Sequence, residues 1–138
     1  MEKNWLDCSD IKFLIISRGR SKSITSHLLF PFATLVVPES EVNDYEKCGL
    51  PIAPCPDNIK GLSLLRNWCL KNFNEHIVVM IDDDISSCVR VDQVTHKKID
   101  DPDYILQVLV NTAQNAFDIG TIVFGFGQSD DVRYYSPD

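Results

Sequence analysis

Three consecutive carboxylates follow a short apolar run in the middle of the chain. Ile77–Ile81 is continuously apolar and is followed by Asp82, Asp83 and Asp84. Side chains alternate between the two faces of a strand, so an extended backbone would point Asp82 and Asp84 to one side and Asp83 to the other. Two convergent carboxylates repel each other, and a raised pKa or a bound cation relieves that repulsion. The pattern therefore indicates a site for a hard divalent ion completed by phosphate oxygens, with a solvated acidic turn as the alternative.

A second group of polar side chains follows an apolar run near the start of the chain. The segment Ser17-Arg18-Gly19-Arg20-Ser21 is rich in hydrogen-bond donors. Gly19 would allow the backbone to approach a ligand closely, and the two arginines would clamp a phosphate group. The alternative interpretation is a surface turn that carries two solvated arginines.

Apolar runs and helix signals alternate along the chain and predict the elements that position these groups. We predict strands at Lys12–Ser17, Ala33–Val37, Leu50–Ala53, Ile77–Ile85 and Thr121–Phe124, and an extended segment at Ile85–Val91. We predict helices at Ser23–Phe30 capped by Ser21 or Ser23, at Glu41–Cys48 capped by Ser40, at Ile59–Phe73 capped by Asp57 or Asn58, and from Asp101-Pro102 to Gly120. The segment Asp92–Asp100 is predicted to be a polar loop.

This alternation predicts the fold class. Strands separated by helices imply a mainly parallel, Rossmann-like sheet with helices on both faces, which is a three-layer α/β/α architecture. Ligands bind such sheets beyond the carboxyl ends of the strands, near a topological switch point. The Ser17–Ser21 loop, the Pro38-Glu39 turn and Asp82–Asp84 all lie at that edge. The two polar groups are therefore expected to share one site.

Composition and charge limit the classes of function. The 138 residues fit one domain, and the net charge of −7 gives no overall basic surface for nucleic acid or for an anionic membrane. The five cysteines are an odd number without a C-x-x-C pair, which favours reduced thiols. No segment is typical of a signal peptide or a membrane span. We therefore expect a cytoplasmic protein without a membrane partner.

The segment from Gly61 to Ile85 resembles a known family of enzymes. Gly61, Arg66 and Asn67 match a Gly-x-x-x-x-Arg-Asn helix that leads to a strand ending in a D-x-D motif, here Asp82–Asp84. This pattern is similar to that of family-two-like glycosyltransferases of the GT-A fold, which use nucleotide-diphospho-sugars. Pro38, Glu39 and the acidic helix after them are similar to the glycosyltransferases associated with modified DNA bases. The match spans nearly all of this chain, but only the donor-binding half of a usual family domain.

The resemblance implies a role for each matching residue. Asp84 and Asp82 would bind Mn²⁺ or Mg²⁺, Arg18 and Arg66 would approach the diphosphate or the base, and Glu39 would bind the base or the ribose. The complete set expected to bind the nucleotide sugar, with a UDP-sugar favoured, is Ser17, Arg18, Arg20, Glu39, Arg66, Asn67, Asp82 and Asp83. In the alternative interpretation, Arg66 caps a sheet edge or pairs with Glu75, Glu39 supports the following helix, and Asn67 is a structural helix residue.

The resemblance also implies a division of the chain. We expect an N-terminal arm at residues 1–10, a nucleotide-binding part at 11–91 and an incomplete acceptor part at 92–138 within one domain. Asp130 or Asp131 would be the catalytic base that activates an acceptor hydroxyl, and a solvated acidic loop is the alternative. The resemblance implies a modified DNA base as one candidate acceptor. The predicted function is metal-dependent sugar transfer to a hydroxyl. A truncated module that only binds nucleotide is the first alternative. A sugar-phosphate nucleotidyltransferase is the second, disfavoured because Gly19 is the only glycine in the loop directly after the first strand.

Overall fold

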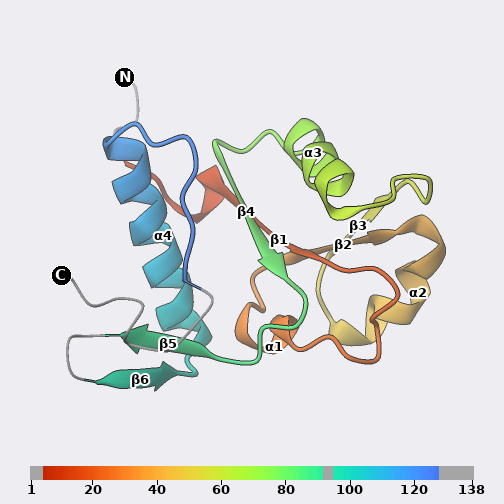
Figure 1. Ribbon diagram of the computed structural model, residues 1–138, viewed down its shortest axis with the longest axis horizontal. Helices are drawn as coiled ribbons and strands as arrows, with labels where there is room; N and C mark the ends of the chain where they lie inside the picture. The colour runs from red at the N-terminus through yellow and green to blue at the C-terminus, as the bar shows by residue number, and fades with distance from the viewer. Residues whose placement is uncertain (1–4, 92–94, 128–138) are drawn as a thin grey trace.

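A four-stranded parallel sheet forms the centre of the protein. The computed structural model describes residues 5–91 and 95–127. The strands are β1 (Ile11–Ile16), β2 (Thr34–Pro38), β3 (Ile52–Cys55) and β4 (Ile77–Asp82), and they lie in the order β3-β2-β1-β4. All three pairings are parallel (Figure 1). The predicted α/β class with a mainly parallel, Rossmann-like sheet is confirmed.

Helices pack on both faces of this sheet. The α-helices are α1 (Ser26–Leu29), α2 (Val42–Tyr45), α3 (Leu62–Asn72) and α4 (Pro102–Asp118). Short 3₁₀ turns are η1 (Cys8–Asp10), η2 (Glu39–Glu41) and η3 (Glu46–Cys48). A separate antiparallel hairpin consists of β5 (Cys88–Val91) and β6 (His96–Ile99), and Figure 1 shows it beside the start of α4.

Alternation along β1 divides the core into two layers. Phe13 and Ile15 belong to one buried cluster, which also contains Ile105 and Leu109 of α4. The residue between them, Leu14, belongs to the other cluster, which contains Leu65 and Cys69 of α3. Full burial of an aliphatic side chain contributes about 1.5–3 kcal/mol. The continuous apolar runs are therefore explained by strands that bury both of their faces.

The order of the strands creates a switch point between β1 and β4. From β1 the chain steps to β2 and β3 on one side, and it then crosses back through α3 to place β4 on the other side of β1. Ile16 at the end of β1 is in register with Asp82 at the end of β4. The loop after β1 and the aspartates after β4 therefore leave the sheet side by side, which positions both groups of polar side chains.

Several predicted helix starts are wrong because the capping residues have other partners. Asp57 accepts hydrogen bonds from the backbone N–H and the hydroxyl of Ser40, at 3.1 and 3.0 Å, so neither residue caps the predicted helix. The helix predicted from Ile59 begins at Leu62, after Gly61 with φ +94°. The helix predicted over Ser23–Phe30 covers only Ser26–Leu29, and its N-cap is Thr25. Of the helix predicted over Glu41–Cys48, Glu41 belongs to η2 and the rest forms α2 and η3, which end at Gly49 as predicted.

The strand predictions also need correction at three places. The third strand is shifted from Leu50–Ala53 to Ile52–Cys55, because Pro54 is accommodated in an edge strand. The predicted loop at Asp92–Asp100 contains β6, whose polar residues show no apolar alternation. Thr121–Phe124 is not a strand. Its first residue instead donates to the carbonyl of Ala116 at 2.9 Å after Gly120, and Ile122 is 98% exposed.

The predicted start of α4 is confirmed. The side chain of Asp101 accepts a hydrogen bond from the backbone N–H of Asp103 at 3.0 Å, and Pro102 occupies the first turn. Within the described residues, no helix is long and apolar enough to cross a membrane.

Candidate functional site

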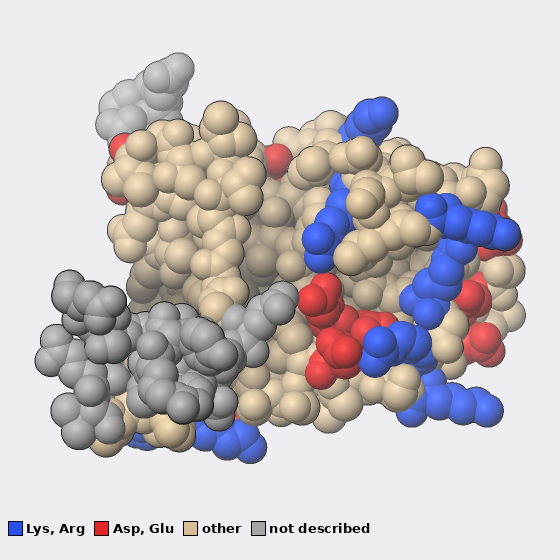
Figure 2. All heavy atoms as spheres, in the orientation of Figure 1, with Lys and Arg blue, Asp and Glu red and all other residues tan. Residues whose placement is uncertain are grey.

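The three aspartates lie at the carboxyl end of β4 and differ sharply in exposure. The side chains of Asp82 and Asp84 are 53% and 59% exposed, whereas that of Asp83 is 9% exposed. The predicted alternation therefore holds, although β4 itself ends at Asp82. Figure 2 shows an acidic cluster on this face with basic side chains on more than one side of it. Asp82 and Asp84 are accessible to a ligand, and Asp83 faces the interior.

Asp83 belongs to a closed ring, made of hydrogen bonds and one ion pair, with Tyr45 and the loop after β1. The hydroxyl of Ser17 donates to Oδ2 of Asp83, and the hydroxyl of Tyr45 lies 2.7 Å from Oγ of Ser17. The backbone N–H of Arg20 donates to Oη of Tyr45 at 3.1 Å. Nε of Arg20 lies 3.5 Å from Oδ1 of Asp83 and completes the ring. Arg20 is thus held both through its backbone and through its side chain.

The direction of the bonds in this ring follows from the protonation of Tyr45. Burial raises the pKa of the Tyr45 hydroxyl, and the hydrogen bond with Ser17 opposes this shift only in part. The phenol therefore stays protonated at neutral pH. Since Ser17 uses its own proton on Asp83, Tyr45 donates to Ser17 and accepts from Arg20.

The exposed aspartates are paired with arginines from two different elements. An Nη of Arg20 lies 3.3 Å from Oδ2 of Asp84, and an Nη of Arg66 on α3 lies 3.5 Å from Oδ1 of Asp82. Both arginine side chains are nearly half exposed. Exposed ion pairs of this kind contribute only about 0–1 kcal/mol, so a phosphate or a cation competes for either partner at little cost. Arg66 contacts Asp82, which corrects the alternative that paired it with Glu75.

Residues at the start of α1 hold the aspartate turn in place. The buried hydroxyl of Ser26 donates to the carbonyl of Asp82 and accepts from the backbone N–H of Ile85 at 2.9 Å. The backbone N–H groups of Thr25 and Ser26 both donate to the carbonyl of Asp83. The orientation of the carboxylates therefore depends on α1 as well as on β4.

The remaining predicted residues surround this centre. An Nη of Arg18 donates to the backbone carbonyl of Asp57 at 3.2 Å. Glu39 is exposed and opens η2 directly after β2, and Asn67 is exposed on α3. Within residues 5–91 and 95–127, neither Glu39 nor Asn67 bonds to the three aspartates. Ser17, Arg20 and Arg66 thus contact the aspartates directly. Arg18, Glu39 and Asn67 lie around this centre without contacting the three aspartates among the described residues.

Gly19 shapes the loop between the two arginines. It adopts φ +67°, and its N–H donates to Oε2 of Glu41 at 2.7 Å. Other residues would be strained at this angle, which explains a glycine here. Glu41, Tyr45, Asp57 and Ser26 all support the site and were not predicted. The sequence carried no signal for their contacts, because each bonds to a residue at least 17 positions away.

Asp82 and Asp84 are the predicted ligands for a metal ion, and both side chains are more than half exposed. Among the residues that the structure describes, no group of three or more His, Cys, Asp or Glu side chains is arranged to hold a metal. A hard ion such as Mg²⁺ is commonly bound by one or two carboxylates together with substrate phosphates. Asp84 and Asp82 supply exposed oxygen ligands of the right type. The proposed catalytic residues Asp130 and Asp131 lie outside the described residues.

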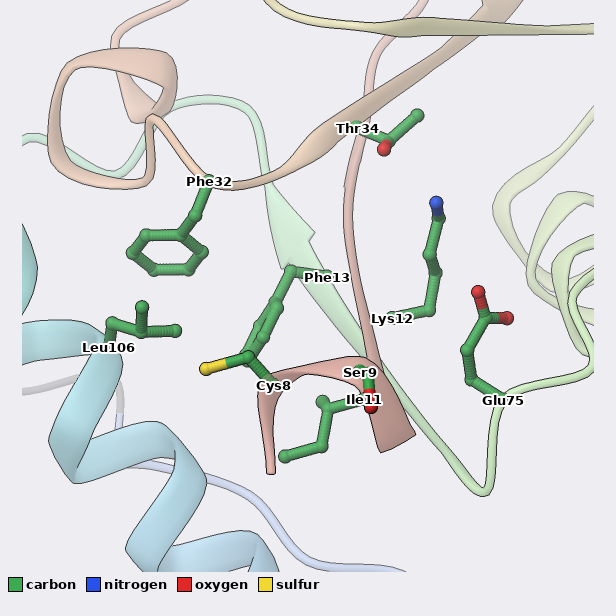
Figure 3. A pocket seen from close by; sticks show the side chains of 9 residues that line it. All are labelled: Cys8, Ser9, Ile11, Lys12, Phe13, Phe32, Thr34, Glu75 and Leu106. Atoms are coloured by element: carbon green, nitrogen blue, oxygen red, sulfur yellow. The ribbon is translucent and has the colours of Figure 1, made fainter. Parts of the chain in front are cut away.

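A cavity of about 270 Å³ lies at the amino end of β1, away from this site. Figure 3 shows Lys12 and Glu75 on one side of it and Phe13, Phe32 and Leu106 on the other. None of the predicted site residues lines it. The candidate site is therefore the exposed, charged edge at the carboxyl ends of β1 and β4.

Comparison with known proteins identifies the family of this chain. A family model described as TAGT, TET-Associated Glycosyltransferase, matches residues 11–129. Searches of curated proteins and of solved structures gave no match. The matched region includes the whole parallel sheet, the three aspartates, and Arg20 and Arg66, which pair with them. The chain therefore belongs to the TET-associated glycosyltransferase family.

Proposed function

We propose that this protein is a metal-dependent glycosyltransferase that transfers a sugar from a nucleoside-diphosphate donor to a hydroxyl group. The observation that carries the proposal is the pairing of Arg20 with Asp84 and of Arg66 with Asp82 at the switch point of the sheet. It places exposed cations and exposed carboxylates together, which suits a diphosphate and its counter-ion. A UDP-sugar is the favoured donor.

The chemistry of sugar transfer assigns a task to each charged group. Breaking the bond between the sugar and the diphosphate leaves extra negative charge on the departing nucleoside diphosphate. Cations placed where this charge develops stabilise the transition state. Arg20 and Arg66 would bind the diphosphate oxygens, because a guanidinium group offers paired donors to phosphate. Arg18, Glu39 and Asn67 lie around this centre and would contact the nucleoside.

The exposed carboxylates would hold the divalent ion that accompanies the donor. Asp84 is the first candidate and Asp82 the second, and Mn²⁺ or Mg²⁺ would supply charge neutralisation at the diphosphate. Asp83 is buried against Ser17 and Arg20, so its contribution is to orient neighbouring groups. We assign the role of general base to Asp130 or Asp131.

The family description suggests the acceptor. Its name links the family to TET proteins, and the sequence resembles glycosyltransferases associated with modified DNA bases. A hydroxyl group on a modified DNA base is therefore the acceptor that we propose. We also propose that the protein acts in the cytoplasm.

Ligand-dependent stabilisation tests the donor site. The melting temperature is measured with UDP and several UDP-sugars, each with and without Mn²⁺. A ligand at about 100 times its Kd stabilises the folded state by about 2.7 kcal/mol, which gives a clear shift. We expect a shift that needs both nucleotide and metal, and we expect Asp84→Ala to abolish it. Asp118→Ala, at the exposed end of α4, is the matched control and should retain the shift.

Turnover separates the proposed enzyme from a module that only binds nucleotide. Sugar transfer to DNA that contains a hydroxymethylated base is followed by mass spectrometry of the nucleosides. Transfer that disappears in Asp84→Ala supports the enzyme. Nucleotide binding without transfer to any hydroxyl acceptor favours the binding module, and release of pyrophosphate from a nucleoside triphosphate indicates a nucleotidyltransferase.

A further inference from the structure

Tyr45 is a completely buried side chain whose only polar atom points to the candidate site. Its exposed fraction is 0%, and those of Ser17 and Asp83 are 3% and 7%. Three buried polar residues from three separate segments thus meet at the carboxyl edge of the sheet. A buried polar group is costly unless its hydrogen bonds are satisfied, so such a network constrains the segments that it joins.

The network joins the segments at one residue, Arg20. Tyr45 binds the backbone N–H of Arg20, and Asp83 binds its Nε. With both ends fixed, the guanidinium extends across the aspartate turn so that an Nη reaches Asp84. Without the hydroxyl of Tyr45, the loop after β1 would lose the bond that connects it to α2 at this point.

We propose that Tyr45 is a positioning residue, which orders Arg20 for binding the diphosphate of the donor. This inference rests on the proposed function and adds a residue to its site. A long arginine side chain loses rotamer freedom when it binds phosphate, and a preorganised one loses less. Tyr45 therefore raises the affinity for nucleoside diphosphate without touching it.

A double-mutant cycle measures whether Tyr45 acts through Arg20. The dissociation constant for UDP in the presence of Mg²⁺ is determined by titration calorimetry for the wild type, Tyr45→Phe, Arg20→Lys and the double variant. The phenylalanine keeps the buried ring and removes one hydroxyl. The lysine keeps the charge but lacks the fork that spans Asp83 and Asp84. Circular dichroism at the same temperature confirms that each variant is folded.

We expect Tyr45→Phe to weaken UDP binding by about threefold to tenfold in the wild-type background, which corresponds to the loss of one hydrogen bond. In the Arg20→Lys background the same substitution should have almost no effect, because the guanidinium that it orders is gone. Tyr104→Phe, which changes a 38% exposed tyrosine on α4, should bind UDP like the wild type.

Three results would overturn the inference. Unchanged UDP affinity in folded Tyr45→Phe contradicts it while leaving the proposed function intact. Equal losses from Tyr45→Phe in both backgrounds show that Tyr45 does not act through Arg20. Failure of the wild type to bind any nucleoside diphosphate, with Mg²⁺ or Mn²⁺, contradicts the proposed function and the inference together.

Discussion

Adjacent aspartates in one turn have different physical roles, and burial decides between them. Asp83 is enclosed by Ser17 and Arg20, whereas Asp84 is exposed and bonds to Arg20 alone among the described residues. The sequence predicted the alternation but assigned Asp83 to the nucleotide sugar. The structure favours an orienting role for Asp83, because its carboxylate oxygens are already used inside the protein.

This difference predicts unequal effects on stability. Asp83→Asn weakens the buried hydrogen bond from Ser17 and removes the ion pair with Arg20, and it should lower the free energy of unfolding by about 2 kcal/mol. Asp84→Asn removes an exposed ion pair and should change it by less than about 1 kcal/mol. Urea denaturation measures both values. Similar values for the two variants would show that burial of Asp83 does not matter.

Ser26 gives a second prediction at the scale of single residues. Its hydroxyl satisfies the carbonyl of Asp82 and the N–H of Ile85, and its side chain is completely buried. Ser26→Ala leaves both backbone groups without this partner and should cost about 1–3 kcal/mol in urea denaturation. Ser23→Ala is the control, since the exposed hydroxyl of Ser23 makes only a 3.4 Å bond to the carbonyl of Arg20. Equal stabilities for the two variants would contradict the role of Ser26.

Among the elements, the sheet and the hairpin differ in how firmly packing holds them. β1 lies between two neighbouring strands and buries both faces. β5 and β6 pair only with each other within the described residues, and three of the four residues of β6 are exposed. A two-stranded hairpin is marginally stable in water by itself. Cys88 and Ile99 are its contacts with the main core among the described residues, so we expect the hairpin to open locally more readily than the sheet.

Amide hydrogen exchange measures this difference between the elements. Peptides that cover Cys88–Val91 and His96–Ile99 should exchange far faster than a peptide that covers Ile11–Ile16, because local opening costs less free energy than global unfolding. Added UDP and Mg²⁺ should slow hydrogen exchange in the loop after β1. They should slow exchange in the hairpin less. Protection of the hairpin equal to that of β1 would show that it unfolds only with the whole domain.

The same contrast explains which elements the sequence could predict. Continuous apolar runs identified β1, β2 and β4, because strands buried on both faces leave that signal. β6 reads His-Lys-Lys-Ile and leaves none, since Ile99 is its only residue that packs against the core among the described residues. The helix caps were wrong where Ser40 and Asp57 bond to each other. Local rules did not reveal a contact between residues 17 positions apart.

At the scale of the whole molecule, the location of the site followed from topology and its internal bonds did not. Parallel strands that alternate with helices place the ends of β1 and β4 at one edge, so the sequence predicted that Arg20 and the aspartates would share a site. The ring through Tyr45 depends on how α2 packs under that edge. No spacing rule relates Tyr45 to Ser17, 28 positions away.

Buried thiols connect the core of the molecule to its stability at alkaline pH. Cys69 is fully buried between α3 and the sheet, and burial, with the nearby Cys55 as a smaller cause, raises its pKa to about 11. In the unfolded chain the thiol ionises near its model value of 9.0. Between these two pH values the unfolded state binds fewer protons than the folded state. The contribution of the buried Cys69 thiol to the free energy of unfolding is therefore fully present below pH 9 and is lost as the pH rises towards 11.

We predict that this linkage lowers the free energy of unfolding by roughly 2 kcal/mol between pH 8.5 and pH 11. Urea denaturation across this range, with a reductant present, measures the slope. Cys69→Ala should be less stable at pH 8 because it leaves a cavity, but its stability should fall less steeply with pH. Cys8→Ala removes an exposed thiol and should keep the wild-type slope. Parallel pH profiles for Cys69→Ala and the wild type would show that the Cys69 thiol does not couple ionisation to folding.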